Sequence, residues 1–279
     1  MKHPFTNQVS EKLLILIILF FNSRNWVYKV VPTNTHYKKG SIRNVTRKGI
    51  SYQLDLSDYQ EWLIYFYCKS DSSEYVLDYL NKSEVIFDIG ANVGQTALSM
   101  FKTQKKKALN PSVYAFEPFP STFQKLETNI RLNKQLEIKA YNLGLSKEKG
   151  SLHMMKPTLG NSGGFRMTND QKKGIPVSVI SIDEFVFEKD ISQVDFIKID
   201  VEGFELQVLK GAELTIKRFK PILVFEYSIK NIEAQQGNID IAINQLISMN
   251  YEISTKEGLS NLDEILTLDY QTDLICIPN

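Results

Sequence analysis

Short apolar runs alternate with amphipathic stretches from residue 84 to the end of the chain. Apolar runs without polar alternation are typical of parallel strands that helices cover on both faces. We therefore predict an α/β fold with a Rossmann-like, mostly parallel sheet. The expected strands are 85–89, 113–117, 138–143, 194–200, 221–227, 251–254 and 273–277. The expected helices begin after residue 94, span 121–133, run as one helix from 203 past 214, and span 238–249.

The stretch 144–182 departs from this alternation, and we expect it to be irregular, with strand-like pieces at 151–155 and 177–181. Between these pieces lies a glycine-rich loop, 159–165. A loop this long inside a compact domain is usually functional or disordered. Its polar residues Asn161 and Ser162 are therefore candidate contacts to a cofactor or acceptor, and a lid without specific contacts is the alternative.

The first 80 residues have a different pattern, so we divide the chain into an N-terminal extension, 1–80, and a main domain, 81–279. Residues 41–55 predict a hairpin that turns near Lys48 and Gly49. Residues 57–80 predict helix, begun by Ser57 or Asp58 and interrupted at 69–73. The helix carries aromatic side chains at helical spacing, which indicates a buried face: Tyr59, Trp62, Tyr65 and Phe66.

The segment Leu13–Phe21 consists of nine apolar residues. A membrane-spanning helix needs about 20 residues, so this segment is too short to span. A helix docked on the protein or on a partner subunit is one interpretation. A membrane-surface anchor or a signal segment is the other. The sequence alone leaves both open.

Composition narrows the class of partner. The formal net charge is +1 and no long basic stripe is present, so nucleic acid is not an expected partner. The two cysteines, Cys68 and Cys276, lie far apart in apolar settings, which indicates buried thiols in a reducing compartment. We therefore expect a cytoplasmic protein, peripheral to a membrane if the segment Leu13–Phe21 is an anchor.

The end of the first expected strand carries an acid followed by a turn of the pattern D-x-G-x-N-x-G: Asp88, Gly90, Asn92 and Gly94. Glycine and asparagine allow the positive φ angles of a tight turn, and the following helix offers free N–H groups. The dinucleotide pattern G-x-G-x-x-G is not matched. An acid at this point disfavours a pyrophosphate and favours a ligand with positive charge, such as a sulfonium. The turn therefore indicates S-adenosylmethionine rather than a nicotinamide cofactor.

Two further groups of polar residues end expected strands. Glu117 follows Gly94 by 23 residues, where an acid can accept the hydroxyls of a cofactor ribose. Lys198 and Asp200 share one face of the strand 194–200, and Glu202 follows it, at the edge where open sheets bind ligands. Glu226 ends the next strand. A divalent metal on Asp200 and Glu226 is chemically reasonable, but no spacing requires one and we predict none.

These residues resemble a known family. The segments around 87–95 and 116–118, and above all I-K-I-D-V-E-G-x-E-x-x-V-L-K-G-A at 197–212, are similar to the FkbM-type S-adenosylmethionine-dependent methyltransferases. The resemblance implies a class I methyltransferase fold with seven strands, the last antiparallel, and helices on both faces. It also implies O-methylation of hydroxyls on sugars, glycolipids or polyketide-like products. The implied cofactor-binding residues are Asp88, Gly90, Ala91, Asn92, Gly94, Gln95, Glu117, Pro118 and Asp200.

Methyl transfer to a hydroxyl needs an aligned acceptor and a base within hydrogen-bond reach. The expected base is Asp200, then Glu202, with Lys198 beside them; Glu226, Asn161 and Ser162 are expected on the acceptor side. His153 is a chemically natural base, although a lone histidine in a strand is usually structural. The alternatives are a nicotinamide-dependent or sugar-nucleotide enzyme and a non-catalytic binding module. The expected partner is a hydroxyl acceptor, and a homo-oligomer is left open.

Overall fold

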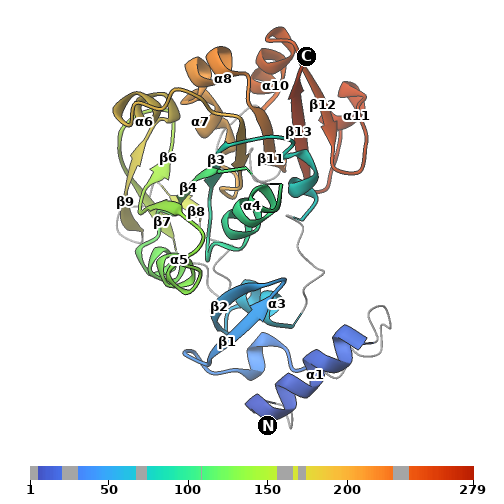
Figure 1. Cartoon of the computed structure of the whole chain (residues 1–279). Helices are drawn as coiled ribbons and strands as arrows, with labels where there is room; N and C mark the ends of the chain where they lie inside the picture. Colours follow the sequence, from blue (N-terminus) through green and yellow to red (C-terminus); the bar gives the residue numbers. More distant parts are fainter. Residues whose placement is uncertain are drawn as a thin grey trace. The chain divides into compact units, whose positions relative to one another are not determined.

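The computed structural model describes residues 6–20, 31–66, 74–107, 109–155, 166–168, 174–228 and 239–279 (Figure 1). The described residues form two units. The first comprises 6–20 and 31–66, and the second comprises the described residues from 74 onward. The boundary predicted at residue 80 stays a prediction. Asn161, Ser162 and Cys68 lie outside the described residues.

The first unit contains a helix, a hairpin and a second helix. Its elements are α1 (Gln8–Phe20), η1 (Asn34–His36), β1 (Ile42–Arg47), β2 (Ile50–Asp55) and α3 (Tyr59–Phe66). The strands pair antiparallel, and the turn between them uses positive φ angles at Lys48 (48°) and Gly49 (72°), as the sequence predicts. Asp58 begins α3, because its Oδ1 accepts the amide N–H of Gln60 at 3.0 Å.

Helix α1 is docked on this unit through one face. Glu11 is fully buried, and its two carboxylate oxygens accept from Arg43 of β1 at 2.6 and 2.9 Å. Leu14, Ile15 and Ile18 are buried on the same side. The described part of Leu13–Phe21 is therefore docked on the protein through one face, and the membrane-surface interpretation stays a prediction. Across the described chain, no helix combines the length and apolar character that a membrane crossing requires.

The second unit is built on a seven-stranded sheet (Figure 1), in the order β12-β13-β11-β10-β3-β4-β5. The strands are β3 (Val85–Ile89), β4 (Ser112–Phe116), β5 (Ile138–Tyr141), β10 (Phe196–Ile199), β11 (Ile222–Tyr227), β12 (Tyr251–Thr255) and β13 (Thr272–Pro278). Strand β13 runs antiparallel to both of its neighbours, and the other neighbouring strands of this sheet pair in parallel. The predicted sheet is confirmed.

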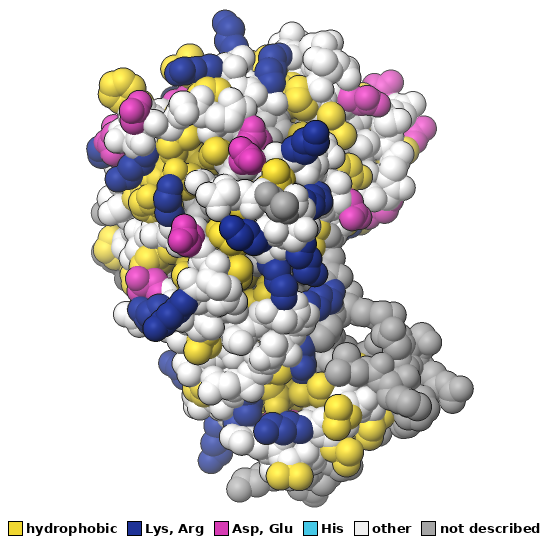
Figure 2. All heavy atoms as spheres, in the orientation of Figure 1, with side chains coloured by type: hydrophobic (Ala, Val, Ile, Leu, Met, Phe, Trp, Pro, Cys, Tyr) yellow, Lys and Arg dark blue, Asp and Glu magenta, His cyan; other side chains and the backbone are white. Residues whose placement is uncertain are grey.

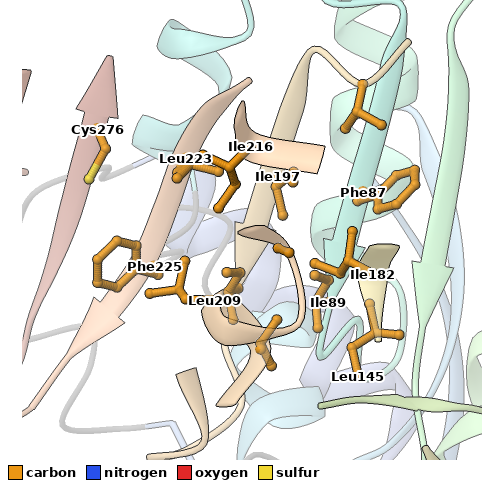
Figure 3. Close-up of a cluster of buried hydrophobic side chains, with 14 of the residues drawn as sticks. Phe87, Ile89, Leu145, Ile182, Ile197, Leu209, Ile216, Leu223, Phe225 and Cys276 are labelled. Atoms are coloured by element: carbon orange, nitrogen blue, oxygen red, sulfur yellow. The ribbon is translucent and has the colours of Figure 1, made fainter. Parts of the chain in front are cut away.

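The helices of this unit fill the connections between strands. They are η2 (Glu74–Tyr79), α4 (Gln95–Lys106), α5 (Pro120–Leu132), α6 (Ile182–Glu188), α7 (Glu205–Lys210), α8 (Glu213–Phe219), α10 (Ile239–Ser248) and α11 (Leu262–Leu266). A large apolar core joins α6, α7, α8 and α10 to the sheet, and Figure 3 shows part of it. Phe87, Ile197 and Phe225 contribute to this core from neighbouring strands. Alternate residues of the same strands, such as Asp88 and Lys198, point to the opposite face.

Two expectations of the sequence need correction. The strand-like pieces expected at 151–155 and 177–181 are confirmed as strands, but they belong to a sheet that was not expected. The irregular stretch contains a four-stranded sheet in the order β6-β9-β7-β8, which comprises β6 (Gly144–Leu145), β7 (Gly150–Met155), β8 (Arg166–Thr168) and β9 (Ile175–Ile180). This sheet has a small core of its own, built from Phe119, Met154, Val177 and Val179. Strands β7 and β9 are short and mix exposed with buried residues, so their apolar pattern is weak.

The single helix expected after residue 203 is two helices, α7 and α8. At the break, a Cβ on Gly211 would lie 2.0 Å from the carbonyl oxygen of Ser146, so the chain passes too close for any other residue. Asp183 of α6 stabilises the start of α8, because its carboxylate accepts the amide N–H groups of Leu214 and Thr215 at 3.0 and 2.8 Å. Leu214, in the first turn of α8, is 70% exposed.

Candidate active site

The turn after β3 brings three strand ends together. The amide N–H groups of Gly90 and Ala91 donate to the carbonyl oxygen of Phe116, at 3.0 and 2.9 Å, and so fix the turn to the end of β4. The φ angle of Gly90 is +82°, and a Cβ there would lie 1.8 Å from the carbonyl oxygen of Asp200. Glycine is therefore required at position 90, because the end of β10 lies where a side chain would begin.

The rest of the turn also has positive φ angles, 48° at Asn92 and 91° at Gly94, before α4 begins at Gln95. Glu117, at the end of β4, holds this turn. Its carboxylate accepts the amide N–H of Asn92 at 3.1 Å and that of Phe119 at 2.9 Å. Burial raises the pKa of Glu117 to about 7, although both amide hydrogen bonds oppose the rise. Its predicted contact with a ribose stays a prediction.

Lys198 lies between Asp88 and Asp200, two acids at the ends of neighbouring strands. It is the register partner of Asp88 in the parallel pair of β10 and β3. Its Nζ lies 2.9 Å from Oδ2 of Asp200 and 3.9 Å from Oδ1 of the fully buried Asp88. Burial alone would lower the pKa of Lys198, but the carboxylates of Asp200 and Asp88 together raise it above its usual value. Lys198 is therefore a cation between two carboxylates.

Glu205 is a site residue to which the sequence analysis gave no role. The turn after β10 has positive φ angles at Glu202 (54°) and Gly203 (100°). Oε1 of Glu205 accepts the amide N–H groups of Val201 and Gly203, each at 3.1 Å, and so fixes this turn. Burial raises the pKa of Glu205 to about 7, against these amide hydrogen bonds. Its sequence signal is an acid two residues after a glycine at the start of a helix.

Asp200, Glu202 and Glu226 form a carboxylate cluster, with one oxygen from each within 4.8 Å of the others. The sequence placed all three on one rim, and the structure brings them together. Gln271 donates to the carboxylate of Glu226. Burial, followed by the negative charges of Asp200 and Glu202, raises the pKa of Glu226 to about 8. Such a cluster is chemically suited to share a proton, and carboxylates also suit a hard divalent cation.

The remaining predicted residues lie in two places. Pro118 follows Glu117, and its carbonyl oxygen accepts from the side-chain amide of Asn142 at 2.9 Å. His153 lies in β7, where it pairs with Pro176 and Thr168 in the four-stranded sheet. Among the described residues, no hydrogen bond or ion pair joins His153 to the carboxylate cluster, so the structure supplies no argument for it as a base.

The raised carboxyl pKa values predict a pH dependence of stability. Glu117, Glu205 and Glu226 have pKa values of about 7, 7 and 8 in the folded chain, against 4.5 when unperturbed. The folded chain therefore binds more protons than the unfolded chain between about pH 5 and 8, and the free energy of unfolding falls as pH rises through this window. Urea unfolding without cofactor measures this fall.

Glu226→Gln should make the fall shallower, because the glutamine cannot ionise. Glu252→Gln, at an exposed position of β12, is the matched control and should leave the profile unchanged. A wild-type free energy of unfolding that rose steadily from about pH 5 to 8 would contradict the prediction.

The strand order, the reversed β13 and the acid-glycine turn at the carboxyl end of β3 define a class I methyltransferase fold. A family model for the methyltransferase FkbM domain matches residues 88–254, more than half of the chain. The chain therefore belongs to the FkbM family of S-adenosylmethionine-dependent methyltransferases. Its cofactor is S-adenosylmethionine, which replaces the nicotinamide alternative.

The chain is similar to several named methyltransferases. The chain is 26% identical to the hexuronic acid methyltransferase AglP of Haloferax volcanii over 156 residues, which is 56% of this chain and 61% of AglP. It is 27% identical to the 31-O-demethyl-FK506 methyltransferase FkbM of Streptomyces tacrolimicus over 164 residues, 48% of this chain and 61% of the relative. The chain thus spans less than two thirds of both relatives.

A solved structure, methyltransferase FkbM from Methylobacillus flagellatus KT, aligns with a TM-score of 0.47 at 20% identity. The alignment covers 70% of this chain and 44% of that protein.

Proposed function

We propose that the chain transfers the methyl group of S-adenosylmethionine to a hydroxyl oxygen of a sugar, glycan or glycolipid. The observation that carries the proposal is Asp200, whose side chain is 40% exposed at the carboxyl end of β10, directly beside the glycine turn. An exposed carboxylate at this point suits a base for an acceptor hydroxyl. A sugar acceptor is supported by the name of the Haloferax relative, a hexuronic acid methyltransferase.

The residues at the strand ends fit the cofactor by their chemistry. Glu117 offers carboxylate oxygens that suit ribose hydroxyls, next to a turn whose backbone passes close through Gly90 and Gly94. Asp88 supplies negative charge beneath the turn, with Lys198 beside it. Ala91, Asn92, Gln95 and Pro118 border the same place, and we propose that they contact the adenosine and methionine parts.

S-adenosylmethionine supplies a methyl group on a positively charged sulfur, which already reacts readily with an oxygen nucleophile. The protein then has to align the acceptor oxygen and accept its proton. Lys198 stays protonated and donates to Oδ2 of Asp200, so it orients Asp200 and does not act as a base itself. The other Asp200 oxygen can accept the hydroxyl proton, and Glu202 and Glu226 can pass it on within the carboxylate cluster.

Asp200→Asn should lower kcat by about 10²-fold, because asparagine keeps the shape but cannot accept a proton. The affinity for S-adenosylhomocysteine should change much less than kcat, because asparagine keeps one side-chain oxygen as an acceptor. Transfer of labelled methyl to a panel of glycans and glycolipids measures kcat, and calorimetry measures the affinity. The control is Asp263→Asn, at an exposed position of α11, and it should leave kcat unchanged. Asp195→Asn would not serve as a control, because Asp195 accepts the amide N–H of Val85 at the start of β3.

Each result separates the proposal from its alternatives. An unchanged kcat in Asp200→Asn would exclude Asp200 as the base. Binding of S-adenosylhomocysteine without methyl transfer to any hydroxyl acceptor would favour a non-catalytic binding module. If S-adenosylhomocysteine did not bind at all, the proposed cofactor site would be wrong.

A further inference from the structure

Helix α1 is apolar on two sides. Its inner side, with Leu14, Ile15 and Ile18, is buried in the first unit. Its outer side carries Val9, Leu13 and Leu16, which are 81%, 58% and 63% exposed. Their spacing of four and three residues places them along one face of the helix. We call these three residues the outer stripe. A helix that only packs on its own domain normally has polar residues on its outer side.

The acidic side chains of the first unit are all turned inward. Its described residues include four acids, Glu11, Asp55, Asp58 and Glu61, and every one is buried, with exposures from 0 to 9%. Each has an internal partner. Glu11 binds Arg43, and Asp58 begins α3. Asp55 accepts the amide N–H of Gly40 at 2.8 Å, and Glu61 accepts the amide N–H of Asp55 at 2.7 Å.

The lysines of the same unit are turned outward, whereas Arg43 is paired with the buried Glu11. Four lysines in its described residues are exposed: Lys12, Lys38, Lys39 and Lys48. Ile42, in the strand between these lysines, adds a further exposed apolar side chain at 43%. Figure 2 shows hydrophobic and basic side chains on the visible face of this unit, without acidic ones among them. The described surface of the unit therefore carries exposed apolar side chains and exposed lysines, and its four described acids are all buried.

We propose that the first unit binds the surface of a membrane that contains anionic lipids. The outer stripe enters the headgroup region, and the exposed lysines contact lipid phosphates and carboxylates. An exposed apolar helix face flanked by cations is the usual composition of a helix that lies in the membrane interface. Exposed lysines add to binding because anionic lipids give the surface a negative potential. A second copy of the chain fits less well, since two surfaces of positive charge repel each other.

The proposal concerns the location of the enzyme and is independent of methyl transfer. It is tested with the full chain and no cofactor, by sedimentation with vesicles of phosphatidylcholine alone or with added phosphatidylserine. The chain should sediment with the anionic vesicles and much less with the neutral ones. Binding should weaken strongly when salt is raised, because salt screens the lysines.

Two sets of variants separate the apolar and the charged contributions. The double variant Leu13→Gln, Leu16→Gln should lower the partition constant on anionic vesicles at least tenfold. Leu214→Gln, a matched change at an exposed leucine of α8, should leave it unchanged. Lys38→Gln with Lys39→Gln should lower it about thirtyfold, because each lysine near an anionic surface contributes about 1 kcal/mol. Circular dichroism and urea unfolding check that each variant is folded.

Three results would overturn the proposal. The first is an absence of sedimentation with anionic vesicles. The second is equal binding to neutral and anionic vesicles that the lysine changes do not affect. The third is a dimer by light scattering that the double leucine variant abolishes while vesicle binding is unchanged, which would assign the outer stripe to an interface between two copies.

Discussion

Gly90→Ala should abolish binding of S-adenosylhomocysteine and lower the free energy of unfolding by about 2–5 kcal/mol. The added Cβ would lie 1.8 Å from the carbonyl oxygen of Asp200, and a backbone atom cannot rotate away as a side chain can. The turn and the end of β10 must therefore separate. This separation moves Asn92 away from Glu117 and Asp200 away from the turn, so both sides of the cofactor site change together. Calorimetry and urea unfolding measure the two effects.

Gly258→Ala is the matched control for this change. Gly258 also has a positive φ angle, +90°, but a Cβ there would meet nothing within 4 Å. Its cost is the backbone strain of alanine alone, about 1–2 kcal/mol, with cofactor binding unchanged. If both variants lost the same stability and Gly90→Ala still bound S-adenosylhomocysteine, the close approach of β10 would not constrain position 90.

Lys198→Met should lower the free energy of unfolding by about 3–5 kcal/mol, the usual cost of removing one partner from a buried ion pair. Methionine has a similar length and fills the space of the lysine stem. Asp88, fully buried in the neighbouring strand, then keeps its negative charge without the lysine that faces it. Urea unfolding at neutral pH measures the loss.

A double variant shows whether the loss of stability in Lys198→Met comes from the unpaired charge of Asp88 or from changed packing. Asp88→Asn added to Lys198→Met removes the buried charge and should recover part of the lost stability. Lys217→Met, at an exposed position of α8, should have little effect. A double variant that was less stable than the single variant by the full cost of Asp88→Asn would show that the two residues are not coupled.

The centre of the seven-stranded sheet could be predicted because β3, β4, β10 and β11 are buried almost throughout and therefore carry continuous apolar runs. All six residues of β11 are buried, for example. The acid-glycine turn could be predicted because positive φ angles restrict the residue type at Gly90 and Gly94. These features depend on local rules that a single sequence records.

Other features depend on contacts between residues that are distant in the sequence, and the pattern of a single sequence does not predict such contacts. The break at Gly211 follows from the backbone of Ser146, and the docking of α1 follows from the pair of Glu11 and Arg43, 32 residues apart. Glu205 was missed because an acid in the first turn of a helix is common, and only its hydrogen bonds to the preceding turn show a role.

Gly90 lies so close to the carbonyl oxygen of Asp200 that two segments distant in the sequence must fit each other. The segments 88–94 and 197–203 are complementary surfaces at the level of backbone atoms, not only of side chains. A chimaera that takes one of them from a relative and keeps the other would join two turns shaped for different neighbours. In exchanges of acceptor specificity between members of this family, the crossover points therefore belong outside both segments, so that the pair is inherited together.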